Sequence, residues 1–288
     1  MSTISYKASE LSQPERFKYL VGAVGPRPIC FASTVDKEGR VNLSPYSFFN
    51  AFSSSPPIMI FSPARNRDGN QKHTYLNVKE VPEVVINVVN YPMVQQQSLA
   101  STAYDRGVNE FIKSGLTQVA SDQVRPPRVG EAPAAFECKV LDVKDFGENP
   151  GAGSLIICEV LVIHLQDQYL DDNGFPDSTK LDLVGRLGAN WYTRASGDAL
   201  FEIRKPTRIK GIGIDQLPSS IKESRILTGN ELAKLGGLEK LPSRDEAESM
   251  LSELDLEGII GEDGAHRKAQ ELLKENKRDI ALALLMYR

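Results

Sequence analysis

Residues 26–63 read PRPICFASTVDKEGRVNLSPYSFFNAFSSSPPIMIFSP, and no other stretch of the 288-residue chain shows its structure so clearly. Two apolar runs, rich in β-branched and aromatic residues, flank a turn at residues 36–39. A double proline then precedes a wholly apolar run. This alternation of apolar runs and turn residues predicts β-strands at residues 29–35, 41–52 and 58–61.

The same alternation of strand and turn signals continues to about residue 205. Further strands are expected at residues 84–89, 135–146 and 155–165. The last two should form a hairpin across the glycine-rich segment 147–153, and residues 171–174 should form another turn. Short helices are expected at residues 73–80, 93–100 and 110–114. Strands separated by turns favour a closed β-barrel over a parallel sheet.

The pattern changes near Pro206 and becomes helical and charged from Thr228 onward. Ser243 and Glu246 have the spacing of a capping box. Apolar residues follow at helical spacing: Ala247, Met250, Leu251 and Leu254. We therefore expect a β-rich domain at residues 1–206 and a helical C-terminal extension at residues 207–288, whose role the sequence leaves open.

Composition excludes several classes of protein. The formal net charge is −4 and no basic cluster is visible, which argues against nucleic-acid binding. The N-terminus is polar, and the longest apolar run, residues 155–165, is too short to cross a bilayer. The three cysteines form an odd set without CxxC spacing, in apolar strand context: Cys30, Cys138 and Cys158. We expect free cysteines in a cytoplasmic protein that contacts no membrane.

Small uncharged polar side chains follow the first turn, spaced among aromatic residues: Asn42, Ser44, Ser47 and Asn50. Such donors on rigid backbone are typical of a site for a flat heterocycle that needs hydrogen bonds along one edge. The alternative is that they only satisfy the backbone of a β-bulge.

Cations and hydroxyls come next, at a predicted loop-to-helix junction: Ser62, Arg65, Arg67, Lys72 and Thr74. A junction of this kind is typical of a phosphate site. The alternative is a solvated basic loop. A ring site followed by a phosphate site predicts a mononucleotide cofactor.

Other motifs of catalysis are missing from the sequence. His73 and His164 are far apart, and no Cys, His or Glu cluster has metal-ligand spacing. No nucleophile elbow is present, and Gly211–Gly213 lacks the third glycine of a dinucleotide fingerprint. We therefore predict no metal and no catalytic side chain. Arg27, between two prolines, could bind phosphate, steer a nucleotide or form a salt bridge.

Five blocks in order resemble the flavin reductase-like, FMN-binding split-barrel family, which includes flavoredoxins. They are residues 26–62, HTYLNVKEVPEVVINVV, YDRGVNEFIKSGL, RPPRVGEAPAAFECKVLDV and KLDLVGRLGANWYTR. The resemblance covers roughly residues 10–206. It implies a mainly β fold with some α structure, a Greek-key split barrel, to which the helical extension is added. It also implies a homodimer that holds FMN near the subunit interface.

By this resemblance the chain would be an oxidoreductase that passes a hydride from NADH or NADPH, bound transiently, to the flavin. A partner monooxygenase or another electron acceptor would then use the reduced flavin. Two alternatives are an FMN electron-transfer protein without NAD(P)H turnover and a flavin-binding regulatory module. Catalysis would rest on positioning, because hydride transfer needs no protein acid or base.

The resemblance also implies which residues meet the cofactor. The ring would contact the segment around the first strands, and the phosphate would contact the following loop: Ser44, Pro45, Tyr46, Ser47, Asn50, Ser62, Arg65, Lys72 and Thr74. Arg186, Asn190 and Trp191 would lie near the ring, contributed either by the same subunit or by the second one. Trp191 has an alternative role as a core aromatic that caps the barrel.

Overall fold

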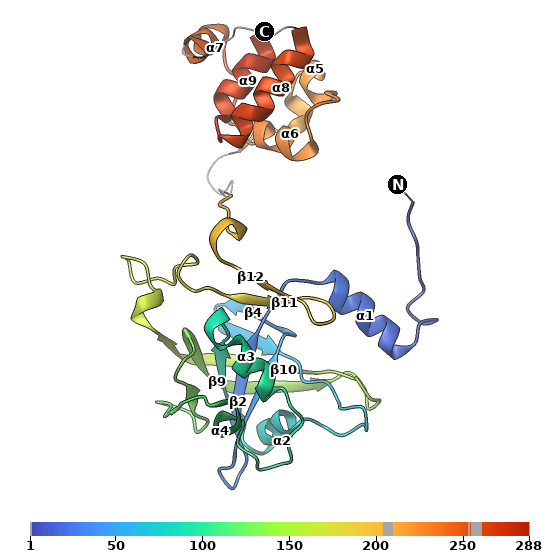
Figure 1. Ribbon diagram of the computed structural model, residues 1–288, viewed down its shortest axis with the longest axis vertical. Helices are drawn as coiled ribbons and strands as arrows, with labels where there is room; N and C mark the ends of the chain where they lie inside the picture. The colour runs from blue at the N-terminus through green and yellow to red at the C-terminus, as the bar shows by residue number, and fades with distance from the viewer. Residues whose placement is uncertain (1, 204–209, 253, 255–260, 288) are drawn as a thin grey trace. The chain divides into compact units, whose positions relative to one another are not determined.

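The structure is a computed structural model that describes residues 2–203, 210–252, 254 and 261–287. The chain divides into two compact units, residues 1–201 and 202–288 (Figure 1). The expected boundary at Pro206 lies outside the described residues. Within the described residues, no helix has both the length and the apolar character to cross a membrane.

A seven-stranded antiparallel sheet forms the first unit, in the order β3-β2-β6-β9-β10-β5-β4. The strands are β2 (Cys30–Val35), β3 (Val41–Tyr46), β4 (Phe49–Ser54), β5 (Pro57–Phe61), β6 (Glu83–Val88), β9 (Ala134–Asp145) and β10 (Ser154–Leu165). Two smaller sheets pair β1 (Arg27–Pro28), β11 (Val184–Arg186) and β12 (Tyr192–Arg194), and β7 (Gln118–Val119) with β8 (Arg128–Val129). The helices are α1 (Gln13–Ala23), α2 (His73–Glu80), α3 (Val94–Ala100) and α4 (Glu110–Ser114).

The prediction of one strand over residues 41–52 is wrong, because the structure divides this run into β3 and β4. These two strands are the opposite edges of the sheet, yet only Ser47 and Phe48 separate them. A flat sheet of seven strands would place its edges about 29 Å apart. A two-residue link spans roughly 10 Å. The sheet must therefore curl until its edges meet, and the predicted split barrel is confirmed.

Hydrophobic clusters lie on both faces of the curled sheet. All six residues of β2 are buried, with Phe31 in one cluster and Cys30 and Ala32 in the other. Cys138 and Cys158 join the second cluster, and all three cysteines are free and buried, as predicted. The long β9–β10 hairpin is also confirmed, and its pairing shifts register at two places.

Among the described residues, Arg27 bonds to backbone carbonyls and not to a carboxylate, so the predicted salt bridge is not found. Its side chain is buried, and its guanidinium donates hydrogen bonds to the carbonyls of Val21 (2.7 Å), Val24 and Leu187 (3.1 Å). Val21 lies in the last turn of α1, a helix that the sequence analysis missed. The signal was readable, because Ser12 and Glu15 form a capping box around Pro14.

In the part of the second unit that the structure describes, the α-helices are α5 (Ser219–Lys222), α6 (Gly229–Gly236), α7 (Arg244–Leu251), α8 (Gly261–Lys274) and α9 (Arg278–Tyr287). The predicted capping box at Ser243 and Glu246 is confirmed, and a second one joins Thr228 to Glu231. Leucines from α6, α8 and α9 fill the core.

The Gly211–Gly213 segment packs its backbone closely against residues 236–238 of this helical unit. The backbone N–H groups of Ile212 and Gly213 donate to the carbonyls of Leu238 and Gly236, both at 2.8 Å. A side chain on Gly236 would place its Cβ 2.8 Å from the Gly213 carbonyl carbon and 2.9 Å from the Ile214 nitrogen. The glycines therefore allow two backbones to meet.

We predict that Gly236→Ala lowers the free energy of unfolding of the helical unit by about 2 kcal/mol, because the backbone at Gly213 must move away. Gly229→Ala in the same helix is the matched control, since nothing lies within 4 Å of the added carbon. Urea unfolding followed by far-UV circular dichroism, with hydrogen exchange at Ile212, measures both. Equal stability of the two variants would contradict the packing argument.

Candidate functional site

A chain of three adjoining cavities runs along the β3 side of the first unit. The central cavity, of about 220 Å³, shares Pro45, Tyr46 and Ser101 with a cavity of about 500 Å³, here called the Ser47 cavity. It shares Asn66, His73 and Tyr104 with a third of about 600 Å³, the Gln71 cavity. The three cavities are therefore neighbours that share lining residues, and together they are called the groove.

The residues expected to meet a ring come together at one end of this groove. Strand β3 supplies Ser44, Pro45 and Tyr46 to the central cavity. Ser47 and Asn190 line the Ser47 cavity, although they are distant in sequence. Arg186 lies beside them, with its guanidinium 4.5 Å from the centre of the Tyr192 ring.

Two of the expected phosphate residues also line the groove. Lys72, just before α2, borders the central cavity, and Arg65 borders the Gln71 cavity. His73 lines both cavities and is half-buried. Burial, together with the charges of Arg106 and Lys72, lowers the pKa of His73.

Four other expected residues do not line these cavities. Thr74 is fully buried and accepts a hydrogen bond from the Asn42 amide at 2.9 Å. Asn50 is exposed on β4 and accepts from the Ala51 backbone. The backbone of Ser62 donates to the Phe48 carbonyl. Trp191 is 74% exposed, so it is not a core aromatic of this chain.

Glu110 is a groove residue that the sequence analysis missed. It begins α4, is 3% exposed, and accepts a hydrogen bond from the Leu43 backbone at 2.9 Å. Burial raises its pKa, although the Leu43 hydrogen bond opposes this. In the sequence, Glu110 appears only as an acidic residue in the first turn of a predicted helix, beside an apolar residue. That local pattern does not reveal its partner Leu43, 67 residues away.

We predict that Glu110→Gln gains stability relative to the wild type as the pH rises from about 4 to about 8. A raised folded-state pKa contributes stability below the unfolded-state pKa, and this is lost as the pH rises through the folded-state pKa. Glutamine does not ionise, so the variant avoids that loss while keeping the acceptor for Leu43. Urea midpoints across this range measure the difference, with exposed Glu148→Gln as control. Parallel profiles for variant and wild type would contradict the assignment to Glu110.

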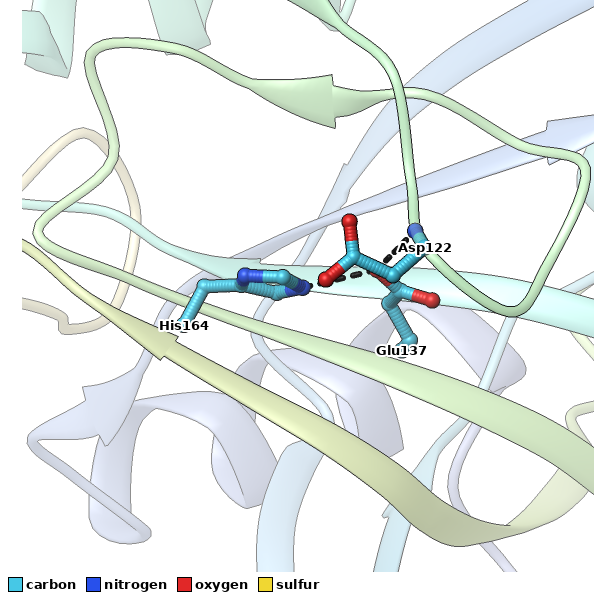
Figure 2. A group of neighbouring side chains, drawn as sticks. All are labelled: Asp122, Glu137 and His164. Carbon is cyan, nitrogen blue, oxygen red and sulfur yellow. Dashed lines mark hydrogen bonds and ion pairs between the residues drawn. The ribbon is translucent and has the colours of Figure 1, made fainter.

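Asp122, Glu137 and His164 form a cluster outside the groove, and their potential ligand atoms lie within 4.8 Å of one another (Figure 2). The Glu137 carboxylate is fully buried and accepts from the backbone N–H groups of Asp122 and Gln123, both at 2.7 Å. His164 Nε2 lies 2.7 Å from the same carboxylate. Burial would raise the Glu137 pKa, but these partners outweigh it and the pKa is lowered. The carboxylate therefore fixes the position of residues 122–123. Both of its oxygens already accept hydrogen bonds from protein groups.

We predict that Glu137→Ala lowers the free energy of unfolding by about 2 kcal/mol, because it leaves backbone N–H groups without an acceptor. Asp122→Ala should change it by no more than about 0.5 kcal/mol, since that side chain is exposed. The loss of unfolding free energy caused by Glu137→Ala should become smaller as the pH falls. A carboxylate whose pKa is lowered in the folded state stabilises the fold only while it is ionised. Thermal unfolding with and without a chelator tests this. A chelator effect abolished by both substitutions would show a metal site instead.

Comparisons with known proteins match the first unit. A sequence model of the family described as flavin reductase like domain matches residues 24–179. An Aquifex aeolicus protein is 34% identical over 187 residues, which cover 65% of this chain and 93% of that protein. A Bacillus subtilis protein is 32% identical over 192 residues, 66% of this chain and 93% of that protein.

Solved structures show the same fold. Nitrilotriacetate monooxygenase component B from Bacillus cereus is 26% identical, with a TM-score of 0.65 over 71% of this chain and 99% of that chain. The 2-nitrobenzoate 2-nitroreductase of Pseudomonas fluorescens is 24% identical, with a TM-score of 0.62 over 73% of this chain and 100% of that chain. Flavoredoxin of Desulfovibrio vulgaris is 22% identical, with a TM-score of 0.53 over 64% of this chain and 92% of that chain.

Proposed function

This chain belongs to the flavin reductase-like family, and from that premise we propose that it binds FMN in the groove and passes a hydride from NADH or NADPH to the flavin. The observation that carries the proposal is that the Ser47 cavity and the central cavity lie side by side and share lining residues. The Ser47 cavity has the polar walls that a ring requires, and it shares Pro45, Tyr46 and Ser101 with a cavity that Lys72 borders.

The wall of the Ser47 cavity supports the placement of the ring. Its polar side chains are mostly uncharged, and three of them come from α3 and the residue after it: Gln97, Ser98 and Ser101. Neutral donors hydrogen-bond a heterocycle without adding a charge that would shift its redox potential. The Tyr46 hydroxyl lies near Thr74 and Ser44 but has no hydrogen-bond partner among the described residues. A bound flavin, through its ring or its ribityl chain, could supply that hydrogen-bond partner.

Charge and helix geometry support a position for the phosphate beside Lys72. Lys72 immediately precedes α2, so the first backbone N–H groups of that helix follow it directly in the chain. A dianionic phosphate favours this combination of a cation and free N–H donors. Thr74 is buried behind this wall, where its contact with Asn42 shapes the cavity.

The bound flavin supplies the hydride-accepting chemistry, and the protein residues provide position. Pro45 removes one backbone donor and stiffens the cavity wall between Ser44 and Tyr46. Fixing two reactants in line can offset ~7–11 kcal/mol of a bimolecular barrier. The nicotinamide nucleotide would enter from the Ser47 cavity, which Asn190 and Arg186 line.

The proposal includes a cytoplasmic homodimer that serves an electron acceptor. Large apolar side chains are exposed on β4, β9 and β10: Phe52, Leu141, Leu161 and Ile163. A second copy could cover them. Free buried cysteines fit a reducing compartment. The similarity to a monooxygenase component supports a partner oxygenase as the acceptor.

We expect anaerobic mixing of the FMN-loaded protein with NADH or NADPH to bleach the flavin absorbance rapidly. Ser47→Leu should fold but lose flavin, because the side chain fills the Ser47 cavity. Absorbance spectra and circular dichroism measure these outcomes. Bound FMN that stays oxidised with both nucleotides would favour an electron-transfer or regulatory role. A protein that takes up no flavin would refute the proposal.

A further inference from the structure

Glu110 is a buried carboxyl group in the wall of the central cavity, where the flavin phosphate is proposed to bind. Its side chain is 3% exposed, and it lines this cavity together with Lys72. The Leu43 backbone donates to its Oε2 atom at 2.9 Å, and among the described residues no other residue donates to the carboxylate. One of its two oxygens therefore has no donor from a neighbour to stabilise the ionised form.

The charges around the central cavity are few and balanced. Among its lining residues, Lys72 and Glu110 carry formal charges of opposite sign, and His73 can take up a proton. A cavity of about 220 Å³ would be about 7 Å across if it were round, which is less than the Debye length of ~8 Å at physiological salt. Lys72 and Glu110 therefore both act on a charge placed inside the cavity, whether or not they touch it.

A bound phosphate would upset this balance. A phosphate monoester carries between one and two negative charges near neutral pH. Lys72 offsets one of these charges, whereas an ionised Glu110 adds another of the same sign. Like charges at close range favour protonation of a carboxyl group. Burial already raises the pKa of Glu110, and a phosphate in the same cavity would raise it further.

The other titratable groups around Glu110 are limited in number and kind. The Tyr46 hydroxyl on β3 interacts with Glu110, and its own pKa is raised, mainly by burial. Helix α3 packs against α4 and has no titratable side chain. The remaining groups are Lys72 and His73 at the start of α2, Tyr104 in the central cavity wall, and Lys113 of α4, which lies against the Tyr104 ring.

His73 is the competing site for a proton in this cavity. Burial and the charges of Arg106 and Lys72 lower its pKa. A bound phosphate would oppose this shift, because it favours the imidazolium form. An experiment on Glu110 must therefore separate its proton from one taken up by His73.

We propose that Glu110 takes up a proton when the flavin phosphate binds and releases it when the flavin leaves. This rests on the proposed function, because the phosphate must occupy the central cavity beside Lys72. The affinity for FMN then falls as the pH rises, since more Glu110 is ionised in the free protein and must be protonated for binding. Glu110 thereby couples retention of the flavin to the acidity of the solution.

The test compares FMN with riboflavin, which has the same ring and no phosphate, in fluorescence titrations of the flavin-free full chain. Each dissociation constant is divided by that of Glu110→Gln, so that ionisation of the FMN phosphate itself cancels. As the pH rises from 5 to 9, we expect this ratio to rise at least fivefold for FMN, because only the wild type gains a negative charge in the cavity. For riboflavin the ratio should stay constant within a factor of two.

Controls separate this effect from damage to the fold and from His73. Glu110→Gln keeps an acceptor for Leu43, and unchanged riboflavin affinity would show that its cavity is intact. Calorimetry in buffers of different ionisation enthalpy counts the protons taken up with FMN. This number should be larger for the wild type than for Glu110→Gln. His73→Gln should still take up the Glu110 proton, and exposed Glu148→Gln should match the wild type.

A ratio for FMN that does not change with pH would overturn the role of Glu110 and leave the proposed function intact. Proton uptake that persists in Glu110→Gln and disappears in His73→Gln would also overturn it, because the proton would belong to His73. The same pH dependence for riboflavin as for FMN would place the effect on the ring and overturn the link to the phosphate. Failure of both flavins to bind at any pH would overturn the proposed function itself.

Discussion

The two residues between β3 and β4 impose the constraint on which the first unit depends. Antiparallel pairing places these strands at opposite edges of seven, and the short link forces the edges together. Curling the sheet brings β3 beside the polypeptide that follows β5. The groove lies along this seam, with Ser44 to Ser47 on one side and Lys72 on the other. The barrel is therefore closed by the same segment that supplies the polar wall.

Buried polar side chains then hold the irregular segments around the barrel. Arg27 donates hydrogen bonds to three backbone carbonyls. Glu137 accepts hydrogen bonds from the backbone N–H groups at 122–123, and Glu110 accepts one from the Leu43 backbone. Glu137 and Glu110 join segments that have no regular pairing with one another, and Arg27 joins α1 to the residue after β11. Because a buried donor or acceptor left unpaired is costly, these contacts fix loop positions that apolar packing alone would leave free.

Much of the fold could be predicted, because strand alternation and capping are local signals. The hairpin β9–β10, the helix at 73–80 and the box at Ser243 follow from neighbouring residues. The division of residues 41–52 could not be seen, since that run is β-like throughout and only distant pairing assigns its halves to different edges. The same holds for the groove: Ser47 and Lys72 carried a local signal, whereas Glu110 and Tyr104 reach it through tertiary contacts.

The Arg27 contacts link the N-terminal helix to the outer end of the groove. The carbonyls it holds belong to α1 and the turn after it, and to Leu187, which precedes Asn190 in the loop between β11 and β12. Loss of α1 would leave a buried guanidinium with fewer acceptors and loosen that loop. Residues 13–23, which line none of the three cavities, would then govern how well the entrance is ordered. Shortened forms of the protein would differ in substrate access before they differed in fold.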